Sequence, residues 1–192
     1  MPLAVAPPSI ITHQVGQHRA ADLLFAQLEK LHDAPVDHAK DLVGQAVVAL
    51  MKHSVAEETL LYPLVRERVP GGDELADQEI ARLDLAEQTM KDLEGLEPTD
   101  ERFWPLVHDL IAQARRHVYE QEFRLFPLLL RSCPNAELVR RGEAARRSGK
   151  LAPTRPHPAA PNEGAALAVL APGVGLVDRL RDLLSGRNRR PS

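Results

Sequence analysis

The sequence predicts an all-α protein, an up-down antiparallel four-helix bundle followed by a basic tail. Three observations predict this fold class. The 192 residues are 44% hydrophobic and 27% charged but only 4% aromatic, a composition rich in helix-forming residues. Apolar residues recur at helical spacing in four successive segments, which short breakers separate. Four helices with short connections bury their apolar stripes best when they pack antiparallel.

The first two segments, residues 9–32 and 36–68, form the first predicted helical hairpin. Ser9 is a candidate N-terminal cap, because its hydroxyl can accept a hydrogen bond from a free backbone N–H of the first turn. The second segment ends at the Pro-Gly-Gly of residues 70–72, which predicts a turn.

The third and fourth segments, residues 74–95 and 100–131, form the second predicted hairpin. The third segment closes near Gly95, and Pro98 lies just beyond it, a usual sign of a helix end. The fourth segment is expected to begin at Thr99 or Asp100.

An internal repeat relates the second and fourth segments. After His53 and after His117, a Glu or Gln follows four residues on, a Glu five on, a Leu eight on, an aromatic residue nine on and a Pro ten on. Pro63 and Pro127 therefore occupy matching places. Each is expected to kink its helix or bend the last turn, because proline removes a backbone hydrogen bond. The repeat predicts two hairpins related by a pseudo-twofold axis.

The repeat also predicts a candidate metal site in the bundle interior. Residues four apart project from one side of a helix, so His53 and Glu57 can reach one point, and His117 and Gln121 can reach it from another helix. His18 would complete the set from the first helix. Helical bundles bind iron or manganese with such imidazole and carboxylate groups. The alternative, that these histidines are ordinary satisfied core residues, stays open at this point.

Four further side chains are weaker candidate ligands: Gln121, Glu58, Glu87 and Glu122. Gln121 offers a neutral carbonyl, and Glu87 lies one turn after Leu83 on the third segment. Glu58 and Glu122 lie about 100° further round their helices, where they can equally be solvated.

These segments resemble the hemerythrin-like proteins with HHE cation-binding domains, over roughly residues 10–131. The resemblance rests on the strings Gln17-His18-Arg19, His53-Ser-Val-Ala-Glu57-Glu58, Leu61-Tyr62-Pro63, Val69-Pro70-Gly71-Gly72 and Leu125-Phe126-Pro127. It implies a four-helix bundle that holds a non-heme di-iron centre.

The resemblance implies the ligands His18, His53, Glu57 and His117. Two positions depart from the family pattern: Leu83 stands at the place of the third-helix histidine, and Gln121 at that of the fourth-helix carboxylate. The sequence therefore predicts an incomplete di-iron ligand set, which leaves one ion, two ions or none as alternatives.

The function implied by the resemblance is binding or sensing of dioxygen, nitric oxide or peroxide, or iron handling. Whether the chain is an enzyme stays open. The alternative hypothesis is a metal-free helical interaction module whose bundle and C-terminal helix bind a protein partner.

Composition and charge exclude several classes of protein. The net charge of -3 lacks the basic excess of a nucleic-acid-binding protein. A single cysteine, Cys133, excludes an intramolecular disulfide and a cysteine-framed zinc site, and it favours a cytoplasmic location. The sequence has no long apolar run and no export signal at its N-terminus, so stable membrane insertion is not expected.

The chain is expected to divide into a bundle domain over residues 10–132 and a tail over 133–192. The tail carries 11 Lys/Arg and 5 Asp/Glu, whereas the rest of the chain carries 13 and 22. Its sequence predicts a basic helix over 134–147, a Pro-rich linker over 148–164 and a short amphipathic helix over 174–186. The last of these is expected to dock on the bundle or on a protein partner rather than on a membrane.

Overall fold

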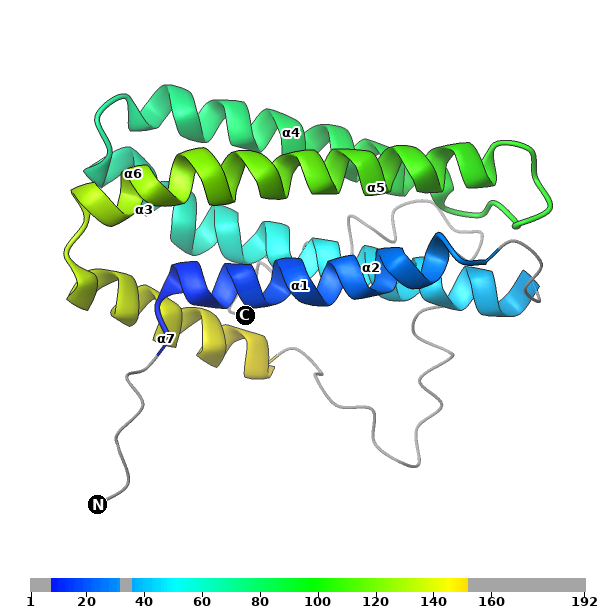
Figure 1. The fold of residues 1–192 in the computed structure, drawn as a ribbon, viewed down its shortest axis with the longest axis horizontal. Coiled ribbons are helices and arrows are strands. Elements are labelled where there is room, and N and C mark those ends of the chain that lie inside the picture. Colours follow the sequence, from blue (N-terminus) through cyan, green and yellow to red (C-terminus); the bar gives the residue numbers. More distant parts are fainter. Residues whose placement is uncertain (1–7, 32–35, 152–192) are drawn as a thin grey trace, which may run out of the picture.

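The four predicted segments all form helices. The computed structural model describes residues 8–31 and 36–151, and these ranges contain helices and no strand (Figure 1). The helices are α1 (Ile10–Leu28), α2 (Val36–Ala56), α3 (Tyr62–Arg68), α4 (Gly72–Leu93), α5 (Phe103–Glu120), α6 (Phe126–Ser132) and α7 (Asn135–Leu151), with π-helical turns η1 (Glu57–Leu61) and η2 (Gln121–Leu125).

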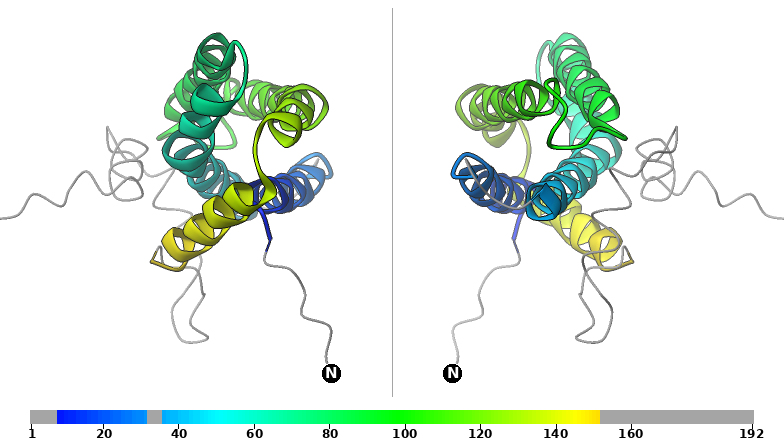
Figure 2. Two further views of the ribbon diagram at one scale, coloured as in Figure 1. Left: turned by 90° about the vertical axis from the view of Figure 1, so that its left-hand side faces the viewer. Right: turned by 90° about the vertical axis from the view of Figure 1, so that its right-hand side faces the viewer.

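Helices α1 and α2 pack as one antiparallel hairpin, and α4 and α5 pack as a second (Figure 1). End views show these four long helices at the corners of the bundle, with α7 outside them against α1 (Figure 2). The predicted fold class, an all-α up-down bundle, is confirmed. None of the helices in the described ranges combines the length and apolarity needed to cross a membrane.

The helix ends follow local chemistry. Ser9 caps α1 as predicted, since its hydroxyl oxygen accepts a hydrogen bond from the Thr12 backbone N–H at 3.2 Å. The fourth segment begins later than expected, at Phe103. Instead of capping that helix, the Asp100 carboxylate accepts from the backbone N–H of Arg102 at 2.9 Å and holds a turn.

Each of the two long helices that contain a proline is interrupted by a π-helical turn. Turns η1 and η2 end two residues before Pro63 and Pro127, at Leu61 and Leu125. A π-helical turn holds one residue more than an α-helical one, so its hydrogen bonds span five residues, as from the Tyr62 N–H to the Glu57 carbonyl. The sequence repeat therefore recurs as a repeat in backbone geometry, and the disturbance expected at the prolines takes this form.

Two apolar clusters fill the interior, and a polar layer separates them along every long helix. The first cluster includes Phe25, Val47, Met51, Met90, Phe103 and Leu110. The second cluster includes Ile10, Leu61, Leu64, Leu83, Leu129 and Leu138. The candidate ligands lie between the two clusters in each helix that carries them.

Helix α7 packs on α1 and shares the second cluster. The predicted basic helix is therefore formed. It packs against the bundle, where Leu138 and Ala145 are buried. The residues of the predicted linker after Leu151, together with the predicted amphipathic helix, lie outside the described residues.

The packing of α7 depends on a glycine. A Cβ atom at Gly142 would lie 2.2 Å from the carbonyl oxygen of Pro8 and 2.5 Å from the carbonyl carbon of Ser9. Gly142→Ala is therefore expected to lower the free energy of unfolding by about 1–3 kcal/mol, because backbone cannot move aside as a flexible side chain can. Gly16→Ala is the matched control, since a Cβ there meets nothing within 4 Å. It should raise stability by about 0.5–1 kcal/mol. Urea unfolding measures both, and a loss of similar size in the two variants would contradict the assigned contact.

Candidate metal centre

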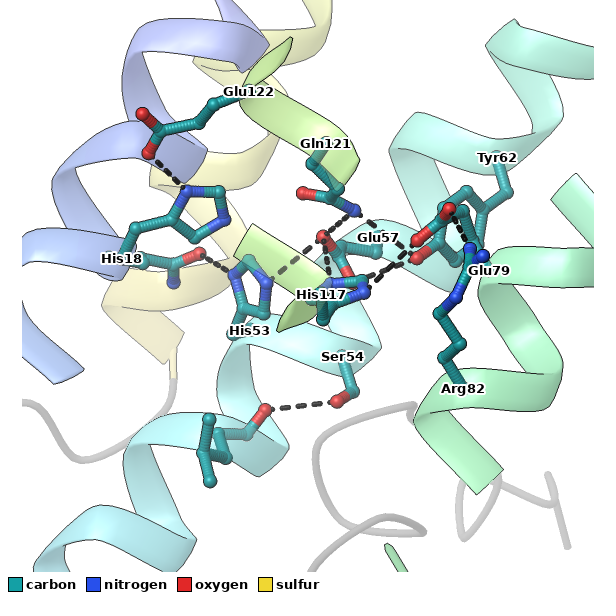
Figure 3. Close-up of polar contacts among 12 residues, drawn as sticks. His18, His53, Ser54, Glu57, Tyr62, Glu79, Arg82, His117, Gln121 and Glu122 are labelled. Carbon is teal, nitrogen blue, oxygen red and sulfur yellow. Dashed lines mark hydrogen bonds and ion pairs between the residues drawn. The ribbon is translucent and has the colours of Figure 1, made fainter. Parts of the chain in front are cut away.

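Three helices and two π-helical turns bring the sequence-predicted ligands into one buried layer (Figure 3). His18 comes from α1, His53 from α2 and His117 from α5. The two π-helical turns begin with Glu57 and Gln121. All five side chains are buried, and Glu57 and Gln121 are fully so.

The Glu57 carboxylate is the centre of this layer. Its Oε1 lies 3.0 Å from His53 Nε2, and its Oε2 lies 3.2 Å from His117 Nε2. The Gln121 amide nitrogen donates to Oε1 at 2.5 Å, and the Tyr62 hydroxyl donates to Oε2 at 3.0 Å. Burial alone would raise the pKa of Glu57, but His53 and His117 hold it well below its usual value, so the carboxylate is ionised.

The π-helical turn explains the position of Tyr62. Residues five apart point to different sides of an α-helix, whereas the wider turn places the Tyr62 hydroxyl over Glu57. In the second hairpin the matching residue is Phe126, which stacks on the His18 ring with a centroid distance of 6.0 Å. The two hairpins thus share the π-helical backbone turn at the site, but the side chains that follow it differ in their chemistry.

His18 is held as a neutral imidazole. Burial and the neighbouring His53 lower its pKa from 6.5 to about 4. Its Nδ1–H donates to Glu122 Oε1 at 2.8 Å, and Arg19 binds the other oxygen of that carboxylate, also at 2.8 Å. The second nitrogen, Nε2, is buried without a hydrogen-bond partner among the described residues. A lone pair therefore points into the site.

His117 lies between two carboxylates. Its Nε2 faces Glu57, and its Nδ1 lies 3.1 Å from Glu79 Oε2, at ion-pair distance but without hydrogen-bond alignment. Burial lowers the pKa of His117, but the charges of Glu57 and Glu79 outweigh it and raise this pKa to about 9. Burial together with the same two carboxylates raises the pKa of Tyr62 well above its usual value.

Glu79 was not predicted from the sequence. It lies on α4, one turn before Leu83, and it is buried beside Arg82, which pairs with its Oε1. The family pattern indicated position 83 as the ligand position of this helix, where Leu83 has no donor atom. The spacing of four residues from Leu83 is the signal that could have identified Glu79.

The weaker candidates have separate places. Glu122 contacts His18 from the outer side, and the Gln121 amide nitrogen faces Glu57. Glu87 is buried on α4 and lies 3.3 Å from the Lys91 ammonium. Glu58 is half-buried on η1 beside Glu57.

The donor set fits one cation. One ligand atom each from His18, His53 and Glu57 lies within 4.8 Å of the others, and all three residues are buried. His18 Nε2 and His53 Nε2 lack hydrogen-bond partners among the described residues, an unusual state for buried nitrogens. Imidazole and carboxylate suit iron, manganese, cobalt or zinc. A second ion finds a poorer set, since Leu83 has no donor and Gln121 turns its NH₂ toward Glu57.

An apolar cavity of about 30 Å³ adjoins the three histidines, which is room for a molecule or two of the size of water. Its apolar walls include Ala21, Phe25, Leu83, Ala86, Met90 and Ala114. The side chain at position 83 thus lines a cavity beside the polar layer.

Comparison with known proteins identifies the family of the chain. Residues 9–129 match the hemerythrin HHE cation-binding domain. The chain belongs to this family.

The hemerythrin-like chain is 25% identical to an uncharacterized hemerythrin-like protein of Schizosaccharomyces pombe over 168 residues, which cover 87% of the chain and 82% of the relative. It is also 31% identical over 111 residues to a DNA nickase of Nostoc sp., covering 57% of the chain and 30% of that protein. No solved structure gives a significant match. The family membership predicted from the sequence is confirmed, and it implies binding of a metal cation.

Proposed function

We propose that the chain binds one divalent metal ion through the Nε2 atoms of His18, His53 and His117 and the carboxylate of Glu57. Non-heme iron is the first candidate for this ion. The observation that carries this proposal is the convergence of two buried imidazole nitrogens, those of His18 and His53, with an ionised, fully buried carboxylate; neither nitrogen has a hydrogen-bond partner in the part of the chain that the structure describes. Such atoms are costly to bury unless something binds them.

The residues of the chain divide the work at this site. Glu57 supplies the negative charge, and the neutral imidazole of His18 offers its lone pair without first losing a proton. Tyr62 and Gln121 hold the carboxylate in place through hydrogen bonds. A bound iron ion would supply a redox-active centre that can accept a small ligand.

The cavity beside the histidines supports binding or sensing of a small ligand. Its walls are mostly apolar, so a neutral diatomic molecule such as dioxygen or nitric oxide suits it better than peroxide, which needs hydrogen-bond partners. Iron handling without a gaseous ligand is the other role consistent with the donor set.

We further propose a cytoplasmic location and no nucleic-acid partner. Cys133 is buried as a free thiol, and the net charge is -3. The DNA nickase shares only a segment with this chain, and that segment covers 30% of its length.

Metal content after anaerobic loading with ferrous iron and desalting tests the proposal. The wild-type chain is expected to retain about one iron per chain. His53→Ala should retain less than about a tenth of that, because it removes a direct ligand. His108→Ala is the matched control, since His108 is exposed at a distance along α5 and should bind iron as the wild type does. A folded, helical wild-type chain that retains no iron would overturn the proposal.

That last outcome would favour the second candidate, a metal-free helical module that binds a protein partner. Two observations favour it. Glu57 accepts hydrogen bonds from Gln121 and Tyr62, and the Nε2 atoms of His53 and His117 lie at ion-pair distance from it. Tyr119 and Phe123 form an exposed aromatic pair, 61% and 71% exposed with ring centroids 4.8 Å apart, of the kind enriched at interfaces.

A further inference from the structure

Each of the three histidines has a side-chain oxygen beside the same ring atom, Nδ1, in a hydrogen bond at His18 and His53 and at ion-pair distance at His117. Nδ1 of His18 faces Glu122 at 2.8 Å, Nδ1 of His53 faces the side-chain oxygen of Gln17 at 3.3 Å, and Nδ1 of His117 faces Glu79 at 3.1 Å. The three acceptors come from η2, α1 and α4, so none lies on the helix of the histidine that it contacts. A hydrogen-bond acceptor at Nδ1 keeps the proton on that atom. The lone pair of Nε2 then faces the interior, where it can bind a cation.

Glu79 has the most unusual place among these acceptors. It lies on α4, which offers no direct ligand to the proposed set of His18, His53, Glu57 and His117. It is 5% exposed, and Arg82 pairs with one carboxylate oxygen while His117 contacts the other. A carboxylate fixed between a guanidinium and an imidazole has little freedom to turn away.

We infer that Glu79 is a positioning residue through which α4 takes part in cation binding, by holding Nδ1 of His117 so that Nε2 faces Glu57 and the cation. The inference rests on the proposed cation site. Leu83 can bind no ion. Helix α4 therefore contributes through Glu79, one turn before Leu83, which contacts the imidazole of His117 on α5.

Cobalt(II) binding to the full chain tests this inference, because the visible absorption of cobalt reports both affinity and ligand geometry. Glu79→Leu removes the acceptor and is expected to weaken cobalt binding by about 10–100-fold and to change the visible spectrum. Glu79→Gln keeps an acceptor oxygen without the charge and should recover most of the affinity and the wild-type spectrum.

Thr89→Val is the matched control for a lost polar contact between α4 and α5. Thr89 is buried on α4 and lies 3.2 Å from the Gln113 side chain, a contact that does not include His117. This variant should bind cobalt with wild-type affinity and spectrum. Circular dichroism of each variant shows whether the bundle is folded.

A second readout needs no metal. Long-range ¹H–¹⁵N spectra of the metal-free chain resolve the two ring nitrogens of each histidine. Glu79→Leu should shift the Nδ1 signal of His117 and leave that of His18, which Glu122 holds.

The outcomes separate the two proposals. A folded wild-type chain that binds no cobalt overturns the cation site and this inference together. A wild-type chain that binds cobalt overturns only the role of Glu79 if Glu79→Leu keeps its affinity, spectrum and Nδ1 signal. The same holds if Glu79→Gln recovers nothing relative to Glu79→Leu.

Discussion

Replacing Glu57 with glutamine is expected to lower the cation affinity of the chain by at least about 100-fold. Loss of an outer-shell partner of a ligand already lowers metal affinity by about 10–100-fold, and Glu57 is the direct ligand that carries the charge. The amide keeps the size of the side chain, and its carbonyl oxygen is a much weaker donor. Cobalt titration of the wild type and of Glu57→Gln measures the effect. Affinity within tenfold of the wild type would show that the cation lies elsewhere.

The same variant changes the pH dependence of the metal-free chain in a known direction. In the wild type the pKa of His117 rises from 6.5 to about 9, with Glu57 the largest of the groups that raise it. A raised pKa means that the protonated imidazole stabilises the folded state. This stabilisation is complete below pH 6.5 and is lost as the pH rises through about 9. Glu57→Gln should flatten the curve of unfolding free energy in that window, and a variant curve parallel to the wild-type curve would contradict the assignment.

The double substitution Leu83→His with Gln121→Glu is expected to raise the binding stoichiometry from about one cation per chain to about two. These changes supply an imidazole on α4 and a carboxylate on η2, the two donors that the second position lacks. Equilibrium dialysis with cobalt or ferrous iron counts the ions. Each single variant should stay near one, and a double variant that also stays near one would show that the second position is closed for another reason.

The metal-free form of that double variant should be less stable than the wild type. Gln121 Nε2 lies 2.5 Å from Glu57 Oε1, so a glutamate there brings two buried carboxylates together. One of them must take up a proton or accept strong repulsion. The melting temperature is therefore expected to fall without cation and to rise steeply when cation is added, because the cation binds only the folded chain.

Much of the fold could be predicted from the sequence because it depends on local regularities. The helical spacing of apolar residues predicted the four segments, and Ser9 caps α1 where its hydroxyl was expected to act. The spacing of four between His53 and Glu57 placed both side chains on one side of a helix, and the structure brings them together at 3.0 Å.

The remaining features depend on contacts between distant parts of the chain. Glu79 matters only because α4 lies next to His117, and its spacing of four residues from Leu83 does not by itself reveal that contact. The docking of α7 depends on the close approach of Gly142 to the start of α1, which its helical pattern does not reveal. The prolines at 63 and 127 indicated a disturbance, but not that one extra residue would be fitted into the turn before each of them.

The extra residue in each π-helical turn gives α2–α3 and α5–α6 a change of phase. An α-helix advances by about 100° per residue, so one inserted residue rotates everything after it by roughly that angle. Before the turn, such a helix presents His53 toward the polar layer, and after it the same helix presents Leu64 and Val65 to the second cluster. A one-residue deletion at exposed Thr59 would cancel this rotation and turn the later half out of register with its neighbours. The number of residues between the histidine and the proline therefore sets how the apolar end of the bundle is rotated relative to the ligand layer.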